Sequence, residues 1–305
     1  RNMMQTNVEL EQAWEFVEHT GTSVFLTGKA GTGKTTFLRS VVEKSQKRLV
    51  VVAPTGVAAI NARGVTIHSF FQLPLSPFVP ESTVKPRFEY SKQKRQIMRT
   101  LDLLIIDEIS MVRADILDAI DSILRRFREH NKPFGGVQLL MIGDLQQLTP
   151  IVRPDEEKLL SRYYNTPYFF DSKALQSTQY VTIELTKVFR QQDKVFIDIL
   201  NHFRDGHVSD EDFDILNKRY QPNFTPDENS DYIHLTTHNR IADNINDRQL
   251  EQIKEQVYKF CARVEGQFPE NSYPADYELT LKCGAQVMFI HNDRFERYYN
   301  GKIGR

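Results

Sequence analysis

Five short, predominantly apolar runs recur along the first part of the chain. They lie at residues 24–27, 49–53, 103–106, 139–142 and 180–185. Each run has the length of a β-strand, and apolar residues at successive positions indicate strands that are buried on both faces. Residues 115–130 have helical periodicity, with apolar side chains on one face and charges on the other. Strands that alternate with helices predict an α/β fold in which helices cover both faces of a parallel sheet.

The pattern starts again beyond residue 185 and indicates a second α/β domain. It predicts helices at 196–203 and 241–259 and strands at 232–236 and 286–290. We therefore expect a first domain at 1–181 and a second domain at 182–305, with the apolar face of the longer helix in a core. Residues 72–99 interrupt the first domain with a proline-rich stretch and a basic run. They predict a small insertion, whose charges form either a solvated face or a nucleic-acid contact.

Composition narrows the classes of partner. The 305 residues carry 39 Lys and Arg against 40 Asp and Glu, so a nucleic-acid partner would have to bind in a local groove. We find neither the apolar start of a signal peptide nor a run of about 18 apolar residues that would span a membrane. Cys261 and Cys283 are too few for a disulfide framework or a zinc site. We expect both to be small buried residues in a reducing compartment.

Residues 28–35, GKAGTGKT, have the spacing of a phosphate-binding loop. A predicted strand precedes the loop and a helix is expected to follow it, which is the context that such a loop requires. Glycines let backbone N–H groups turn toward phosphates, Lys34 adds a positive charge, and the hydroxyl of Thr35 can coordinate Mg²⁺. The residues expected to contact ATP are Gly28, Ala30, Gly31, Thr32, Gly33, Lys34, Thr35 and Thr36. The sequence therefore predicts a protein that binds a nucleoside triphosphate.

Two adjacent acids, Asp107 and Glu108, follow the apolar run at 103–106. In a P-loop fold this strand lies near the one that feeds the loop, so that Asp107 would hold Mg²⁺ and Glu108 would deprotonate the attacking water. The alternative is that the pair caps a helix. A catalytic carboxylate at this position favours an ATP hydrolase over a kinase that transfers phosphate to a bound acceptor.

Two further polar residues are candidates for contacting the γ-phosphate. Gln147 lies in residues 143–150, directly after the fourth strand, where it can detect the phosphate and its loss. Arg190 lies where the second domain is expected to begin, and could reach across a domain cleft to stabilise transition-state charge. A surface salt bridge is the alternative interpretation of Arg190.

Taken in order, these motifs resemble those of superfamily-one helicases. Residues 28–35, 53–59 (APTGVAA), 66–70 (TIHSF), 107–111 (DEISM), 143–150 (GDLQQLTP) and 185–191 (LTKVFRQ) carry the resemblance. The best match is the Pif (petite integration frequency) family of DNA helicases, in a short bacterial form. Residues 115–136, continuing to 139, resemble that family's own signature.

The resemblance implies further contacts, residue by residue. Gln12 corresponds to a glutamine that reads adenine. Contacts to single-stranded DNA are implied for Pro54, Thr55, Gly56, Thr66, His68, Phe70, Thr237, His238 and Asn239. Residues 284–305 resemble the segment that leads into a small SH3-like accessory domain.

The family implies a 5′→3′ DNA helicase with tandem RecA-like domains, the second incomplete here. Implied partners are single-stranded DNA and DNA forks, with G-quadruplexes or RNA–DNA hybrids as further substrates, and a monomer is expected. Implied roles are DNA repair, recombination and telomere maintenance. The expected location is the bacterial cytoplasm at the nucleoid, or the nucleus or mitochondrion in a eukaryote. The family's later DNA-contacting and arginine motifs do not occur between 191 and 305, so we expect a C-terminally truncated chain.

Four other functions stay open at this stage. A RecD-like recombination subunit would carry a nuclease or partner-docking domain, and none is visible. An RNA helicase would leave no readable mark of 2′-OH discrimination. An ATP-dependent switch would bind partners without unwinding, and a metabolic kinase is disfavoured by Glu108.

Overall fold

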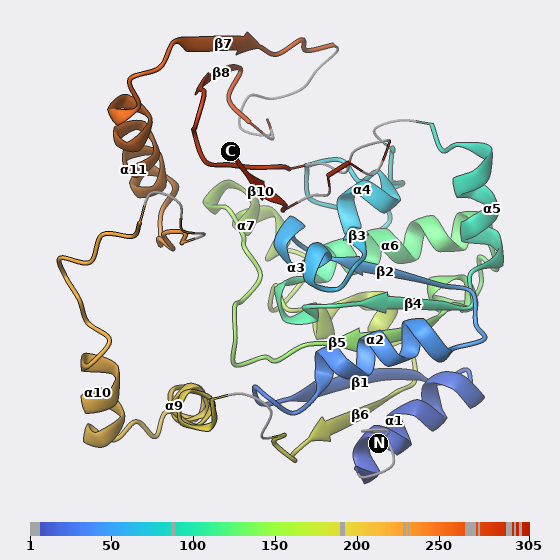
Figure 1. Ribbon diagram of the computed structural model, residues 1–305. Coiled ribbons are helices and arrows are strands. Elements are labelled where there is room, and N and C mark those ends of the chain that lie inside the picture. The colour runs from blue at the N-terminus through green and yellow to red at the C-terminus, as the bar shows by residue number, and fades with distance from the viewer. Residues whose placement is uncertain are drawn as a thin grey trace. The chain divides into compact units, whose positions relative to one another are not determined.

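The computed structural model describes residues 7–86, 89–189, 193–227, 230, 232–265, 273, 275–290, 295, 297–298 and 301–305 (Figure 1). Contacts divide the chain into two compact units, and the boundary in the sequence lies between Asn217 and Lys218. The boundary expected at 181–182 falls inside a strand of the first unit. The assignment of 182–305 to a second RecA-like domain stays a prediction.

The first unit is built on a parallel six-stranded sheet, with the strand order β3-β2-β4-β5-β1-β6. Its strands are β1 (Ser23–Gly28), β2 (Leu49–Ala53), β3 (Val65–Thr66), β4 (Leu103–Ile106), β5 (Gln138–Ile142) and β6 (Tyr180–Leu185). Five of these strands, all except β3, coincide with the apolar runs and confirm the strands predicted there. The sixth, β3, pairs two residues with the end of β2 and is too short to produce a pattern in the sequence.

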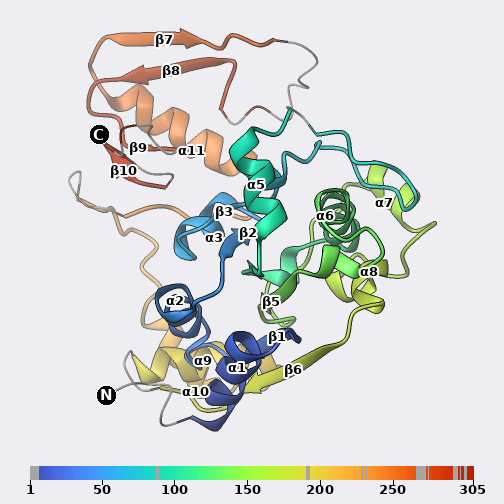
Figure 2. The same ribbon diagram turned by 90° about the vertical axis from the view of Figure 1, so that its right-hand side faces the viewer.

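Helices cover both faces of this sheet, as Figure 2 shows from the side. Alternate residues of β4 separate the two cores, since Leu103 and Ile105 belong to one hydrophobic cluster and Leu104 and Ile106 to the other. The first cluster includes side chains of α1 (Val8–His19) and α2 (Lys34–Lys44). The second includes side chains of α4 (Ile67–Phe71), α5 (Lys92–Thr100), α6 (Ala114–Phe127) and α8 (Lys173–Gln176). The predicted α/β fold is confirmed.

Shorter elements complete the first unit. They are α3 (Gly56–Asn61), η2 (Ile109–Met111), η3 (Pro133–Gly136), α7 (Pro154–Leu160), η4 (Phe169–Asp171), α9 (Lys194–Asp205) and α10 (Asp210–Asn217). In the expected insertion, an irregular proline-rich segment leads into α5. Met98 of α5 is buried, and Lys94 lies over the ring of Phe70 at 4.0 Å. The basic run is therefore only partly a solvated face.

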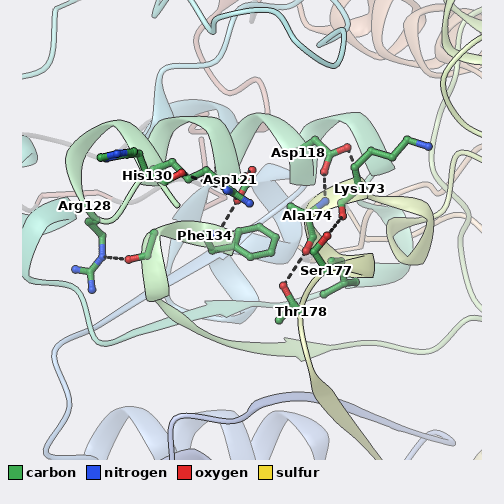
Figure 3. A network of polar contacts seen from close by, with 12 residues as sticks. Asp118, Asp121, Arg128, His130, Phe134, Lys173, Ala174, Ser177 and Thr178 are labelled. Atoms are coloured by element: carbon green, nitrogen blue, oxygen red, sulfur yellow. Dashed lines mark hydrogen bonds and ion pairs between the residues drawn. The ribbon is translucent and has the colours of Figure 1, made fainter. Parts of the chain in front are cut away.

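Helix α6 differs from its predicted amphipathic pattern. The helix ends at Phe127, and its aspartates do not all face solvent, because Asp115 and Asp118 are buried. Asp118 accepts hydrogen bonds from the segment that enters α8, and Asp121 accepts one from the backbone N–H of Phe134 at 2.6 Å (Figure 3). Residues 115–136 thus contain a helix whose carboxylates accept hydrogen bonds from neighbouring segments.

The second unit contains α11 (Asn239–Gln252), β7 (Val257–Cys261), β8 (Glu278–Lys282), β9 (Val287–Met288) and β10 (Ile303–Gly304). The predicted helix at 241–259 is wrong beyond Gln252, since residues 257–261 form β7 and pair antiparallel with β8. No residue of α11 is buried, so its apolar face does not contribute to a core.

Three smaller expectations for this unit also fail. The described residues 232–236 form no strand, and their apolar side chains Tyr232 and Leu235 are exposed. The strand expected at 286–290 shortens to β9, which pairs antiparallel with β10. Cys261 and Cys283 are exposed rather than buried. Among the described residues, no helix combines the length and apolar character needed to cross a lipid bilayer.

Candidate nucleotide-binding site

A pocket of about 350 Å³ opens at the edge of the sheet where β1, β4 and β5 end. The lining residues are Ala30, Gly31, Thr32, Gly33, Lys34, Thr35, Thr36, Asp107, Glu108, Ile142, Gly143, Asp144, Gln147, Phe189 and Ile197. The carboxyl ends of parallel strands are the usual position for ligand sites in α/β sheets. The pocket joins three predicted motifs that are separate in the sequence, at residues 28–35, 107–111 and 143–150.

The loop between β1 and α2 has the backbone of a phosphate cradle. Gly31 and Gly33 have φ angles of 78° and 95°, which side chains larger than glycine rarely adopt. A Cβ atom on Gly31 would also lie 3.3 Å from Cδ1 of Ile197. The hydroxyl of Thr32 donates to the carbonyl of Lys29 at 2.7 Å and stabilises the turn. This geometry fits the polyphosphate of a nucleotide, since it directs N–H groups at the start of α2 toward the pocket.

Lys34 is the first residue of α2, and its ammonium lies against the loop. Its Nζ donates to the carbonyls of Gly28 and Lys29, the latter at 3.0 Å. Burial lowers the pKa of Lys34, and the carboxylates of Asp144 and Glu108 offset part of that effect. Thr35 and Thr36 line the same pocket with exposed side chains. Lys34 therefore lines the pocket with the other residues of the predicted loop, and its role in phosphate binding stays a prediction.

Asp107 and Glu108 reach the pocket from the end of β4. The N–H of Asp107 extends the sheet by donating to the carbonyl of Val52 at 2.9 Å. Glu108 has a left-handed backbone, with φ 51° and ψ 46°, and its side chain makes no capping bond to η2. The helix-cap alternative is therefore not supported. Burial raises the pKa of both carboxyls, and the charge of Asp107 adds to the rise at Glu108.

An ion pair that sequence motifs did not single out borders the pocket. Arg204 of α9 donates to both carboxylate oxygens of Asp144, Nε to Oδ2 at 2.7 Å and Nη2 to Oδ1 at 3.0 Å. Burial raises the pKa of Asp144, but the hydrogen bonds from Arg204 and from the N–H of Gln146, together with the positive charges of Arg204 and Lys34, outweigh burial and hold that pKa below its ordinary value. Gln147 donates its Nε2 to Oδ2 of the same carboxylate at 3.3 Å. Asp144 belongs to the predicted motif at 143–150, whereas no sequence motif includes Arg204.

The side chains predicted to contact DNA lie outside this pocket. Pro54, Thr55 and Gly56 follow β2, and the hydroxyl of Thr55 accepts from the N–H of Ala58 at 3.2 Å. Thr66 ends the neighbouring strand β3, and its hydroxyl accepts from the N–H of Ser69 at 3.2 Å.

The remaining predicted residues occupy varied positions. His68 is half-buried on α4, whereas Phe70 is buried with its ring against Phe71. Gln12 is exposed on α1 and does not line the pocket. The second unit carries Thr237, His238 and Asn239 with exposed side chains, and Arg190 lies outside the described residues.

A bound Mg²⁺ would fit this donor set. The described residues hold no cluster of three or more His, Cys, Asp or Glu side chains able to form a metal cage. Magnesium at phosphate sites needs only one or two protein oxygens, because water and phosphate oxygens complete its octahedron. Thr35 and Asp107 supply a hydroxyl and a carboxylate to the same pocket.

Comparison with known proteins agrees with this geometry. The model of the PIF1-like helicase family matches residues 4–214. An ATP-dependent DNA helicase PIF1 from Candida albicans is 35% identical over 93% of this chain, which covers 33% of that protein. The structure of Bacteroides Pif1 bound to single-stranded DNA is 41% identical, with a TM-score of 0.86, over 99% of this chain and 69% of the other.

A second Bacteroides Pif1 structure, in complex with ADP-AlF3 and single-stranded DNA, is 40% identical with a TM-score of 0.84, over 97% of this chain and 68% of the other. The chain spans about a third of the length of the first curated relatives that it matches. The matched family model covers the six-stranded sheet, the phosphate cradle and the acidic pair together. On these grounds the chain belongs to the PIF1-like helicase family.

Proposed function

We propose that this protein is an ATP-dependent DNA helicase that translocates 5′→3′ along single-stranded DNA and unwinds duplex or structured DNA. The observation that carries the proposal is the pocket in which Lys34, Asp107 and Glu108 meet around a glycine cradle. That combination can bind a triphosphate and activate water. Coupling of hydrolysis to DNA is supported by membership of the family and by the similar Bacteroides Pif1 structure bound to single-stranded DNA.

The chemistry assigned to each residue follows from its position. Lys34 and the loop N–H groups bind the β- and γ-phosphates, while Thr35 and Asp107 would hold Mg²⁺. The metal ion would neutralise charge on the phosphates. Glu108 accepts a proton from the attacking water, a role favoured by a pKa that burial has raised. Gln147 responds to the γ-phosphate from the end of β5.

DNA binding is assigned to the edge of the sheet beyond this pocket. Thr55 follows β2 and Thr66 is the last residue of β3; the two strands pair in parallel and therefore end on the same side. Each hydroxyl already accepts a backbone hydrogen bond and keeps a proton to donate to a DNA phosphate. Phe70 is buried on α4 and Lys94 lies over its ring, so we assign Phe70 to packing beneath α4 and not to a direct contact with DNA. Binding through phosphates makes affinity tolerant of sequence and sensitive to salt.

Several elements of the proposal rest on the family. Arg190 would stabilise the γ-phosphate in the transition state, Gln12 would read adenine, and Thr237, His238 and Asn239 would contact the strand from a second RecA-like domain. Proposed substrates include DNA forks, G-quadruplexes and RNA–DNA hybrids, and the proposed active form is a monomer. The proposed location is the nucleoid, or the nucleus or mitochondrion in a eukaryote.

Strand displacement on tailed duplexes tests the proposal. We expect ATP-dependent unwinding of a duplex with a 5′ single-stranded tail, little unwinding of the matched duplex with a 3′ tail, and none by Lys34→Ala. Preference for the 3′ tail would contradict the polarity. Hydrolysis without unwinding of either duplex would contradict the motor.

A further inference from the structure

We propose that Arg204 is a positioning residue for ATP hydrolysis, acting through Asp144 on Gln147. The inference rests on the proposed function, because it assigns a role within the same site. Arg204 does not line the pocket itself, whereas Asp144 and Gln147 both do. The three side chains form a continuous chain of hydrogen bonds from α9 to the pocket.

The first step of the argument is electrostatic. Three carboxylates, those of Asp107, Glu108 and Asp144, line a pocket that must receive a triphosphate of the same sign. Asp144 is 1% exposed, so solvent does not screen its charge. The guanidinium of Arg204 binds it through two parallel hydrogen bonds, the geometry in which arginine neutralises a carboxylate best. Arg204 thus removes a negative charge that would repel the nucleotide.

The second step concerns the orientation of Gln147. The carboxylate of Asp144 only accepts hydrogen bonds, so the group of Gln147 that contacts it at 3.3 Å must be the amide nitrogen. The backbone N–H groups of Gln146 and Gln147 also donate to Asp144, to Oδ1 and to the carbonyl, both at 3.0 Å. With Arg204 in place, Asp144 fixes both the loop and the rotation of the amide. The amide oxygen of Gln147 is then the end left to accept from a water molecule.

The third step connects α9 to the phosphate cradle. Nη1 of Arg204 donates to Asp205 at 2.9 Å, and Asp205 accepts from Nζ of Lys29 in the cradle at 2.5 Å. On the same helix, Ile197 lines the pocket near Gly31. Helix α9 therefore contacts both the cradle, through Asp205 and Lys29, and the residue Asp144 beyond β5. Arg204 is the residue that joins the two contacts, since it donates to both Asp144 and Asp205.

Steady-state ATP hydrolysis by Arg204→Lys tests the inference, since lysine keeps the charge and loses the paired hydrogen bonds. We expect kcat to fall by about tenfold with KM for ATP changed less than about twofold, the signature of a contact that matters only in the transition state. Arg39→Lys, a matched change at an exposed position of α2, should retain wild-type values. All assays are run below the melting transition of every variant.

Combination with Gln147→Ala separates positioning from simple structural support. If Arg204 acts through Gln147, the double variant is no slower than the slower single variant, because the two residues work as a unit. Asp144→Asn should show the same dependence on Gln147. Multiplicative losses, unchanged kcat in Arg204→Lys, or a raised KM with normal kcat would each overturn the inference. Failure of the proposed function has a different signature, namely a wild-type protein that does not hydrolyse ATP or a Lys34→Ala variant that still does.

Discussion

Replacement of Asp118 by asparagine is expected to destabilise the first unit strongly. The carboxylate is 5% exposed and accepts four hydrogen bonds that hold α8 and the residues before it against α6. Figure 3 shows how Asp118 lies beside Lys173 and Ala174. Two come from the hydroxyls of Tyr164 at 2.5 Å and Ser172 at 2.6 Å. The other two come from the backbone N–H groups of Lys173 at 3.1 Å and Ala174 at 3.0 Å.

The magnitude follows from what asparagine cannot do. Its carboxamide keeps one acceptor oxygen and turns an NH2 group toward the other two donors, so one backbone N–H loses its acceptor, one hydroxyl has to rotate and accept instead, and no bond is to a charged group any longer. Hydrogen bonds to charged groups contribute about 1.5–3 kcal/mol each, and neighbouring bonds do not add fully. We therefore expect the free energy of unfolding to fall by about 3 kcal/mol. For a unit of this size the melting temperature would fall by about 6–12 °C.

Thermal unfolding followed by circular dichroism measures this loss. Asp155→Asn, the same change at an exposed position of α7, is the control and should shift the free energy of unfolding by less than about 0.5 kcal/mol. Tyr164→Phe should show an intermediate loss, since it removes one of the four bonds. If Asp118→Asn has the same melting temperature as the Asp155→Asn control, the hydrogen bonds of Asp118 do not stabilise the packing of α8 on α6, and the reasoning is refuted.

Three further outcomes are expected. Lys34→Ala should abolish ATP turnover, because it removes the charge from the cradle; unchanged hydrolysis would refute the assignment of the loop. Glu108→Gln should keep nucleotide affinity and lose turnover by about 10²–10⁴-fold, measured by fluorescent-nucleotide binding and phosphate release. Lost affinity with normal turnover per bound ATP would contradict the general-base role. Burial raises the pKa of Tyr90 to about 12, above the ordinary value of about 10 in the unfolded chain. The contribution of neutral Tyr90 to the free energy of unfolding, on the order of 2 kcal/mol, is therefore complete below pH 10 and is lost as pH rises toward 12. Tyr90→Phe should lack that part of the alkaline loss in denaturant titrations, and an identical pH profile would contradict the assignment.

The sequence predicts the parallel sheet and the cradle well because both depend on local signals. Buried parallel strands are apolar at every position, and the glycines of 28–33 are required by backbone angles that other residues rarely adopt. The two residues of β3 carry no such signal, since their pairing is decided by β2. Residues 241–259 carry apolar side chains at helical spacing, yet strand pairing with β8 overrides that pattern from Val257 onward.

The polar contacts of the first unit could not be predicted, because they join residues far apart in the chain. Asp144 and Arg204 are 60 positions apart, and their pairing depends on how α9 lies against the cradle. In the sequence, Asp118 cannot be told from an aspartate on the exposed face of a helix. It is buried because the start of α8 packs against it. Tertiary packing therefore decided which charges belong to the site and which support the fold.

Coupling of ATP hydrolysis to DNA is the central claim, and steady-state turnover tests it most directly. Phosphate release would be measured without nucleic acid, with single-stranded DNA and with RNA of matched sequence, and Lys34→Ala would serve as the background. The account predicts strong stimulation by DNA over both other conditions. Equal turnover in all three conditions would contradict it, because the pocket would then hydrolyse ATP without reference to a bound strand.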